Sequence, residues 1–335
     1  MAIGIGRRQF ISALGGAALT WPFAARAQQP PERVRRIGAL ILYSENDPQS
    51  RRCGTAFEQG MDKLGWTVSR NLQIDYRFGI SDLASGQLAA TELLSLAPDL
   101  MLAHGVSAVR AAQQATHTTP IIFTGASEPV SLGFVASLAN PGGNTTGFTN
   151  LEPSVGGKWL ELLKEIAPNV THVAVLFNPA TNPAFPLFYR SIETAAPKFA
   201  VETIMTPVGE AADIEAVMTR LGREPGSGLI VPPDTFLSNH NKLIVELAAH
   251  NRLPAIYPFK LYAPAGGLVA YGPDVPDEFR RAAAYVDRIF RGERPGDLPV
   301  QQPIKFELVI NIKTAKTLGL TVPQTLLATA DEVID

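Results

Sequence analysis

The chain has 335 residues, of which 46% are hydrophobic and 18% are charged, the composition of an ordinary globular protein with about two domains. A formal net charge of −2, with no arginine-rich stripe interleaved with aromatic residues, argues against nucleic acid as a partner. Cys53 is the single cysteine, which excludes an intrachain disulfide and a cysteine-based metal cage.

The N-terminal segment has the layout of an export signal. Arg7 and Arg8 precede an apolar run that reaches Phe23, and Ala25-Arg26-Ala27 forms an A-x-A cleavage site. The paired arginines followed by Gln9-Phe10-Ile11 are typical of a twin-arginine signal. We expect residues 1–27 to be removed, which takes three of the 29 basic residues and leaves 26 against 31 acids, a charge of −5 on a soluble periplasmic protein. A permanent anchor is the alternative, but the run is short and weakly apolar for a membrane span of about 20 residues.

From residue 36 onward, short β-rich apolar runs alternate with longer amphipathic stretches, a pattern typical of βαβ units and a mostly parallel sheet. The clearest helix of the first half is predicted at 51–65, where Phe57, Met61 and Leu64 recur at helical spacing before Gly65. A second series of the same kind begins near residue 172, so the chain is predicted to repeat one architecture. The predicted strands are 37–43, 72–78, 100–103, 121–124 and 146–148 in the first half, and 172–177, 201–206, 228–231, 255–257 and 268–271 in the second.

The border between the halves is predicted near 150–155, before a helix whose apolar stripe includes Trp159. That stripe predicts Trp159 to be a core residue and not a ligand platform. A strongly amphipathic helix at about 277–291, then a proline-rich link through Pro303, indicates that the chain crosses between the halves more than once. The predicted lobes are 36–150 with about 274–303, and 151–273 with about 304–330. The final stretch reads as a strand running into a short helix, followed by an amphipathic tail.

Signatures of catalysis are missing from the sequence. Gly156-Gly157-Lys158 resembles the end of a phosphate-binding loop, but Glu152 and Trp159 stand where that motif needs a glycine and a Ser or Thr. No dinucleotide fingerprint follows the first strand, and no G-x-S-x-G elbow occurs. The five histidines are scattered, and His104, at a strand end, is best explained as a structural residue. We therefore expect no enzyme activity, no cofactor and no metal.

In an open α/β sheet, ligands bind beyond the carboxyl ends of the strands, so the residues that follow each predicted strand are site candidates. Ser107 is expected to cap the next helix, whose N–H groups and dipole favour an anion. Glu128 could meet an ammonium group or hydroxyls, with a solvated loop carboxylate as the alternative. The candidates of the first half are Ser44, Gly105, Ser107, Ala126, Ser127 and Glu128.

The second half offers a matching set of candidates after its own strands. Asn and Asp in such turns also bond to local backbone, which is the competing explanation for three of them. Tyr257 and Phe259 could stack on an apolar or aromatic ligand. The candidates of the second half are Asn178, Asn182, Asp234, Tyr257 and Phe259.

Several segments together carry a family resemblance: NPGGNTTG at 140–147, KWLELLK at 158–164, LPAIYP at 253–258, YGPD at 271–274 and QPIKFELVIN at 302–311. In this order along the mature chain, they resemble the ABC-transporter substrate-binding family that includes tryptophan- and tyrosine-type binding proteins. The resemblance implies an α/β fold like that of type I periplasmic binding proteins, with two Rossmann-like lobes, parallel sheets and a multi-strand hinge.

The same resemblance implies an exported, monomeric receptor of an ABC import system. It would bind a small molecule between the lobes, amino-acid-like and with aromatic amino acids as the leading candidates, and deliver it to an inner-membrane permease. Family members often show Gly-Thr-Pro where this chain has Gly105-Val106-Ser107, and Asp-Pro-Val where it has Glu128-Pro129-Val130. Because both departures fall at expected ligand contacts, the identity of the ligand stays open. A sensory module for a membrane kinase, or an enzyme on the same fold, are the alternative functions.

Overall fold

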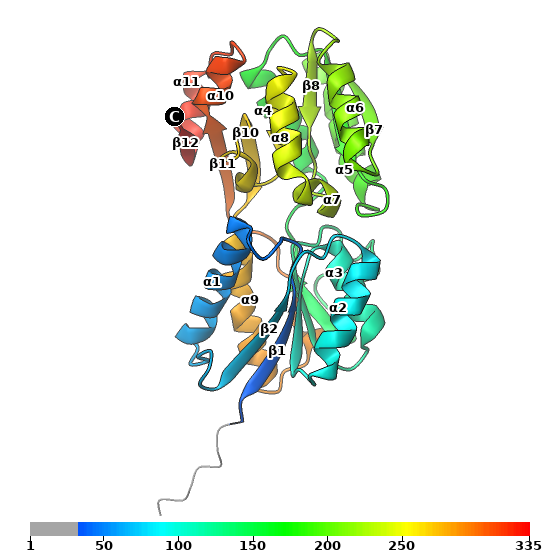
Figure 1. The fold of residues 1–335 in the computed structure, drawn as a ribbon, viewed down its shortest axis with the longest axis vertical. Coiled ribbons are helices and arrows are strands. Elements are labelled where there is room, and N and C mark those ends of the chain that lie inside the picture. The colour runs from blue at the N-terminus through cyan, green and yellow to red at the C-terminus, as the bar shows by residue number, and fades with distance from the viewer. Residues whose placement is uncertain (1–32) are drawn as a thin grey trace, which may run out of the picture. The chain divides into compact units, whose positions relative to one another are not determined.

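The computed structural model describes residues 33–335, and the predicted signal at 1–27 lies outside the described residues (Figure 1). The first sheet has five parallel strands in the order β2-β1-β3-β4-β5. All residues of β3 and β4 are buried, as expected for strands covered by helices on both faces. The strand order reverses between β1 and β3, and such a switch point opens a crevice at the carboxyl ends. The strands are β1 (Arg35–Leu40), β2 (Leu72–Arg77), β3 (Leu100–His104), β4 (Ile121–Thr124) and β5 (Thr145–Phe148).

Helices cover both faces of this sheet. On one face α1 (Pro48–Lys63) packs against α9 (Val275–Phe290), and on the other α2 (Leu83–Ser95) packs against α3 (Val106–Ala115) (Figure 1). The helices α1 and α9 lie close together at Gly60, where a Cβ atom would lie 2.8 Å from the Cβ atom of Ala283. Helix α9, which follows β10 in the chain, therefore completes the helical layer on this face of the first sheet.

The second sheet has seven strands in the order β12-β11-β10-β9-β8-β6-β7. All neighbouring pairs are parallel except β10 with β11. Its strands are β6 (His172–Phe177), β7 (Glu202–Pro207), β8 (Ser227–Ile230), β9 (Ala255–Tyr257), β10 (Val269–Pro273), β11 (Phe306–Asn311) and β12 (Glu332–Ile334). The α-helices that follow or connect them are α4 (Val155–Ile166), α5 (Phe185–Ala195), α6 (Ala211–Leu221), α7 (Thr235–Asn239), α8 (Asn241–His250), α10 (Ile312–Thr317) and α11 (Gln324–Thr329). Short 3-10 turns are η1 (Ala196–Phe199), η2 (Lys260–Tyr262) and η3 (Pro295–Asp297).

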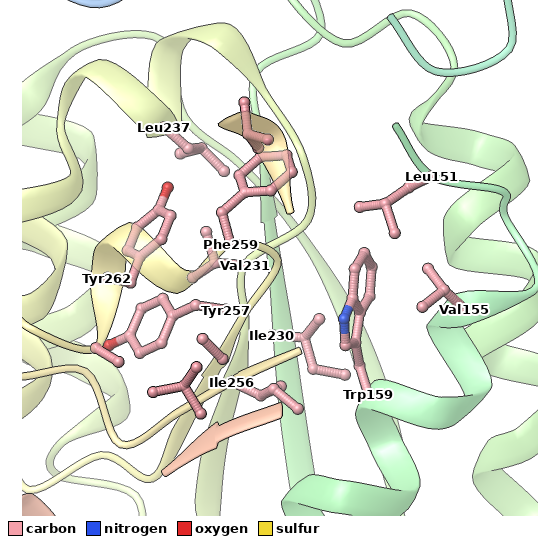
Figure 2. Packing of buried hydrophobic residues seen from close by; sticks show 14 of the residues in the cluster. Leu151, Val155, Trp159, Ile230, Val231, Leu237, Ile256, Tyr257, Phe259 and Tyr262 are labelled. Carbon is pink, nitrogen blue, oxygen red and sulfur yellow. The ribbon is translucent and has the colours of Figure 1, made fainter. Parts of the chain in front are cut away.

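Trp159 on α4 anchors the core beside the second sheet. Its side chain is 0% exposed and lies among Leu151, Val155 and Ile230 (Figure 2). The indole N–H donates to the carbonyl oxygen of Tyr271 at 2.8 Å, so the one polar atom of the ring is satisfied. The prediction that Trp159 is a core residue is confirmed, and truncating such a side chain to alanine typically costs about 3–5 kcal/mol.

The chain passes between the two sheets three times, from β5 to α4, from β10 to α9, and from η3 to β11. The first and third passages run side by side, because the Thr149 N–H donates to the Gln301 carbonyl at 2.9 Å and Gln301 also forms a bridge with Phe148. Residues Val34–Asp335 form one unit of contacts. The predicted fold, two α/β lobes joined by several segments, is confirmed. We call the lobe of the five-stranded sheet the first lobe and the other the second lobe.

Several element bounds differ from the sequence prediction by one to three residues, and the differences in the strands are the most informative. Strand β1 ends at Leu40 and not near residue 43, because its pairing with β3 ends at Ala103 and its pairing with β2 ends at Arg77. Strand β11 runs antiparallel to β10, and the tail adds β12 as a further strand on β11.

Among residues 33–335, no helix has both the length and the apolar character needed to cross a membrane.

Candidate functional site

A cavity lies where the carboxyl ends of strands from both lobes face each other. The space that it leaves for a water-sized molecule is about 30 Å³, whereas pockets for small ligands usually measure about 300–1,000 Å³. Side chains therefore nearly fill the cavity in this arrangement. The first-lobe lining is Leu42, Tyr43, His104, Gly105, Val106, Gly125, Ser127, Leu132 and Val275, with Asn150 from a connecting segment. The second-lobe lining is Thr181, Asn182, Pro183, Ala184, Pro233, Asp234, Thr235, Ser238 and Phe259.

The start of α3 forms one side of the cavity. Gly105 is the N-cap, with φ of 90° and ψ of 157°, a conformation that favours glycine, and no side chain caps this helix. The first N–H groups of α3, at Val106 and Ser107, therefore lack a capping acceptor where Gly105 and Val106 line the cavity. The prediction that Ser107 is the N-cap is wrong, because the helix begins one residue before it. The N-terminus of α3 nevertheless has free N–H groups, as expected for a site that favours a negatively charged group.

Across the cavity, the second lobe comes close to this helix terminus. A Cβ atom on Gly105 would lie 3.7 Å from the hydroxyl oxygen of Thr235, the first residue of α7. That separation is an ordinary van der Waals contact. The two lobes thus approach each other closely at their site-forming loops.

Asn150 joins a connecting segment to the loop after β4. Its Oδ1 accepts the hydroxyl of Ser127 at 2.6 Å and the Leu151 N–H at 2.7 Å, and its Nδ2 donates to the Gly125 carbonyl at 3.2 Å. Both Ser127 and Asn150 are buried yet line the cavity. Their positions are fixed by these bonds before any ligand arrives.

His104, the last residue of β3, presents a neutral ring at the cavity. The ring lies between Tyr43 and Phe279, with centroid distances of 5.3 Å and 5.0 Å. Nδ1 is 3.0 Å from the hydroxyl oxygen of Thr124, whereas Nε2 is buried and has no hydrogen-bond partner in the described part of the chain. Burial lowers the pKa of His104 to about 4, so the imidazole is uncharged at neutral pH. One ring nitrogen thus remains for a further polar contact.

Glu278 of α9 lies buried beside the same loop. Its Oε2 accepts the Gly125 N–H at 3.0 Å, and its Oε1 has no partner among residues 33–335. Burial raises the pKa of Glu278 well above its usual range, against the opposing effect of the Gly125 hydrogen bond, so burial favours the protonated, neutral form of this group. A Cβ atom on Gly125 would lie 2.5 Å from the ring of His104. Only glycine therefore fits between these two side chains.

Asp234 organises the loops of the second lobe. One carboxylate oxygen accepts the Thr181 hydroxyl at 2.7 Å and the N–H groups of Phe236 and Leu237 at 2.8 Å and 3.2 Å, which caps α7. The other oxygen accepts the Asn178 N–H at 2.8 Å. Burial raises the pKa of Asp234, and these four hydrogen bonds act in the opposite direction. The side chain lines the cavity, but most of its acceptor capacity serves the protein.

Asn182 keeps one polar atom available. Its Nδ2 donates to the Pro233 carbonyl at 2.9 Å, which fixes the orientation of the amide and ties the loop after β6 to the loop after β8. The side chain is 6% exposed and lines the cavity. Its Oδ1 is therefore a fixed acceptor that can meet a donor on a ligand.

The structure brings five of the predicted site residues to the cavity: Gly105, Ser127, Asn182, Asp234 and Phe259. Asn178 is adjacent, since its Oδ1 accepts the N–H groups of Ala180 and Thr181 and shapes the loop. This is the local turn role that competes with ligand binding at such positions.

The other predicted residues do not line the cavity. Ser107 and Ala126 are buried beside it, and Ser44 lies exposed in a turn. Glu128 has a left-handed backbone, with φ of 52°, and lines a separate groove with Glu152. Tyr257 is 1% exposed because it stacks on Tyr262 in the core of the second lobe, with ring centroids 4.7 Å apart (Figure 2). The two side chains expected to anchor the ligand from the first lobe and to stack on it, Glu128 and Tyr257, therefore do not reach this site.

Several lining residues had not been chosen from the sequence. Asn150, Thr181, Thr235 and Ser238 stand in loops or first helical turns, where a local role explains them equally well. His104 could have been predicted as a lining residue, because it ends a strand and directly precedes Gly105, which was predicted to lie at the site. Within the described residues, no group of three or more His, Cys, Asp or Glu side chains is placed to hold a metal ion.

Two α/β lobes, joined by several segments around a polar cavity at facing strand ends, define a protein with the type I periplasmic-binding-protein fold. A family model described as ABC transporter substrate binding protein matches residues 46–334, and the chain belongs to this family. Proteins of this class bind a small molecule outside the cytoplasm and deliver it to a permease. The class is defined by binding and not by catalysis.

Individual relatives agree with this assignment. A tyrosine-binding protein of Clostridioides difficile is 26% identical over 290 residues, which cover 86% of this chain and 82% of the relative. A crystal structure of an ABC domain in complex with L-Trp, from Streptococcus pneumonia, is 23% identical with a TM-score of 0.82, covering 90% of this chain and 99% of that one. A conserved domain protein of Vibrio cholerae is 26% identical, with a TM-score of 0.82 and coverage of 90% and 100%.

Proposed function

We propose that this chain is the periplasmic receptor of an ABC importer for an amino acid, with aromatic amino acids as the first candidates. The observation that carries the proposal is the N-terminus of α3, which no side chain caps and which borders the cavity. The described residues that line this cavity include no Lys or Arg. An α-carboxylate can be held there by neutral N–H donors and the helix dipole. The relatives named for tyrosine and bound to L-Trp support the same ligand class.

The remaining polar groups suit the other parts of an amino acid. The Asn182 Oδ1 and the Asp234 carboxylate, in the second lobe, are the oxygen acceptors that an ammonium group needs. Phe259 and Tyr43 offer aromatic surface for the ligand side chain. His104 Nε2 adds one more hydrogen-bonding atom, so a ligand with a polar ring substituent gains a partner there.

Binding on this scheme requires movement of the lobes. The cavity space of about 30 Å³ is too small for an amino acid, so the ligand enters when the lobes separate. The three connecting passages are the elements that would bend. A ligand held by α3 from the first lobe and by Asn182 from the second then favours the closed arrangement, which docks on the permease.

Export by the twin-arginine route is part of the same proposal. It rests on the paired Arg7 and Arg8 and on the Ala25-Arg26-Ala27 site, with cleavage expected after Ala27. Replacing both arginines with lysine should remove the protein from the periplasmic fraction of cells. Undiminished periplasmic protein would contradict this route.

A binding screen tests the ligand class. Mature protein beginning at Gln28 is heated with amino acids, sugars and nucleotides, and a ligand at a hundredfold excess over its Kd should add about 2.7 kcal/mol to stability. For a chain of this size, this appears as a rise of a few degrees in Tm. Amino acids should raise Tm, aromatic ones most. A rise with sugars alone would refute the ligand class, and turnover of any ligand would refute the receptor function.

A matched pair of variants locates the site. His104→Phe keeps an aromatic ring between Tyr43 and Phe279 but removes Nε2, and should weaken binding of the best ligand by about tenfold if a ligand atom is left unpaired. His117→Phe, at an exposed position on the same lobe, should leave the affinity unchanged. Equal affinities of the two variants by calorimetry would remove His104 from the site.

A further inference from the structure

A second hollow opens on the face of the first lobe that carries α1 and α9. It lies where the first turns of these helices meet the segment Phe259–Lys260 and the end of β10, and its volume is about 460 Å³. This is within the range of about 300–1,000 Å³ that small-molecule sites occupy. We call it the arginine groove, after its charged lining of Arg51, Arg52, Lys260, Arg280, Asp274 and Glu307.

The two acidic side chains of the groove share one lysine as their ion-pair partner. Lys305 contacts both, with its Nζ 3.3 Å from the Asp274 carboxylate and 3.0 Å from the Glu307 carboxylate. Asp274 also caps α9 through the Asp277 N–H at 3.2 Å. Both acids therefore have an ion-pair partner other than Arg51 and Arg52.

The cations of the groove divide into paired and unpaired ones. Lys260 pairs with Glu332, and Arg280 pairs with Asp277 at 2.5 Å. Arg51 and Arg52, in the second turn region of α1, are exposed and make no ion pair with any described residue. The groove thus has two guanidinium groups with free donors, and guanidinium groups match carboxylate and phosphate oxygens in bidentate geometry.

Both lobes contribute to the groove. Arg51, Arg52 and Arg280 belong to the first lobe, and Lys260 belongs to the second. Phe259 and Val275 line both this groove and the ligand cavity, so these two side chains form the wall between them. An occupant of the groove would lie beside the ligand site without entering it.

We propose that the arginine groove binds a small polyanion, a molecule with two or more carboxylate or phosphate groups that bridges Arg51 and Arg52 of one lobe to Lys260 of the other. The cavity described above has neutral donors and no Lys or Arg in its described lining, whereas this groove offers charged donors. The two sites therefore select different chemistry. The inference does not depend on which solute the main cavity takes.

Calorimetry with citrate and with pyrophosphate, at low ionic strength, tests the proposal on the mature protein. We expect saturable one-to-one binding of at least one of them, and the comparison separates carboxylate from phosphate preference. Arg51→Ala with Arg52→Ala should weaken it by about tenfold or more, since each lost charge-assisted contact is a substantial part of the affinity. Lys260→Gln should weaken it from the other lobe.

The control removes the same charge elsewhere. Arg190 and Arg223 are exposed on the second lobe outside the groove, and replacing both with alanine should leave anion binding unchanged. Thermal melts of all variants verify that each is folded. Saturable binding of neither anion, or an equal loss in the groove variant and the control variant, would overturn the proposal. A failed amino-acid screen would not, because the anion is measured without any other ligand.

Discussion

Asp234→Ala tests whether this carboxylate builds the site or only touches the ligand. The change leaves four donors without their acceptor: the N–H groups of Asn178, Phe236 and Leu237 and the hydroxyl of Thr181. Loss of the helix cap costs about 0.5–2 kcal/mol, and each buried donor left unpaired costs about 1–3 kcal/mol. Because two of these donors are the ones that form the helix cap, and such costs are not additive between neighbouring groups, we expect a total of about 2–4 kcal/mol. For a chain of this length, that corresponds to a fall in Tm of about 4–8 °C.

Asp82→Ala is the matched control for this measurement. Asp82 also caps a helix, through the Ser85 N–H at 2.8 Å, but it is exposed and serves no other loop. Its loss should cost about 1 kcal/mol. Thermal and urea unfolding followed by circular dichroism compare the two variants. If Asp234→Ala is no less stable than Asp82→Ala, the hydrogen bonds of Asp234 do not hold the loops, and a direct ligand role is the better explanation.

Two further changes probe groups around the cavity. Burial raises the folded-state pKa of Glu278 above its unfolded value of about 4.3. The protonated group therefore stabilises the folded protein. This contribution is complete below about pH 4.3 and is lost as the pH rises through the folded-state pKa. The Tm of Glu278→Gln should therefore fall less with rising pH than the Tm of the wild type. The control Glu215→Gln, at an exposed position, should behave like the wild type. Parallel Tm profiles for wild type and Glu278→Gln would contradict this prediction. Gly105→Ala should cost about 1–3 kcal/mol in urea unfolding because φ is 90° there, although a Cβ atom meets only ordinary contacts. Gly157→Ala, inside helix α4 with a Cβ contact of 3.5 Å, should be neutral or stabilising, and equal effects of the two glycine changes would refute the backbone explanation.

Local pattern was enough to predict most of the fold. The strands at 121–124, 172–177 and 255–257 were predicted with the bounds that the structure shows, because each is a short apolar run between turn residues. Two features could not be predicted in this way: the order of the strands and the antiparallel pairing of β10 with β11. They depend on contacts between residues far apart in the chain, which no local pattern records.

The site was predicted less completely than the fold for the same reason. The rule that ligands lie beyond strand ends selected loops that the structure places around the cavity, but it does not say which side chain of a loop faces that cavity. Tyr257 and Phe259 are two residues apart, yet η2 folds Tyr262 over Tyr257 and leaves Phe259 at the cavity (Figure 2). At Glu128 the left-handed backbone places the residue in another groove. Both outcomes follow from the course of the chain after the strand and not from residue type.

Around the cavity, some polar atoms form hydrogen bonds within the protein and others are left available to a ligand. This division fits a receptor that closes on its ligand. Asp234 and Asn150 each bond to several groups of their own loops, so these loops keep their geometry whether or not a ligand is present. Fixing a loop in advance lowers the ordering cost that binding must overcome. Among the atoms that remain available to a ligand are the first N–H groups of α3 and Nε2 of His104 in the first lobe, and Oδ1 of Asn182 in the second. Because these atoms belong to different lobes, a ligand can use them all only when the lobes are together, so its extra affinity for that arrangement is what favours closure.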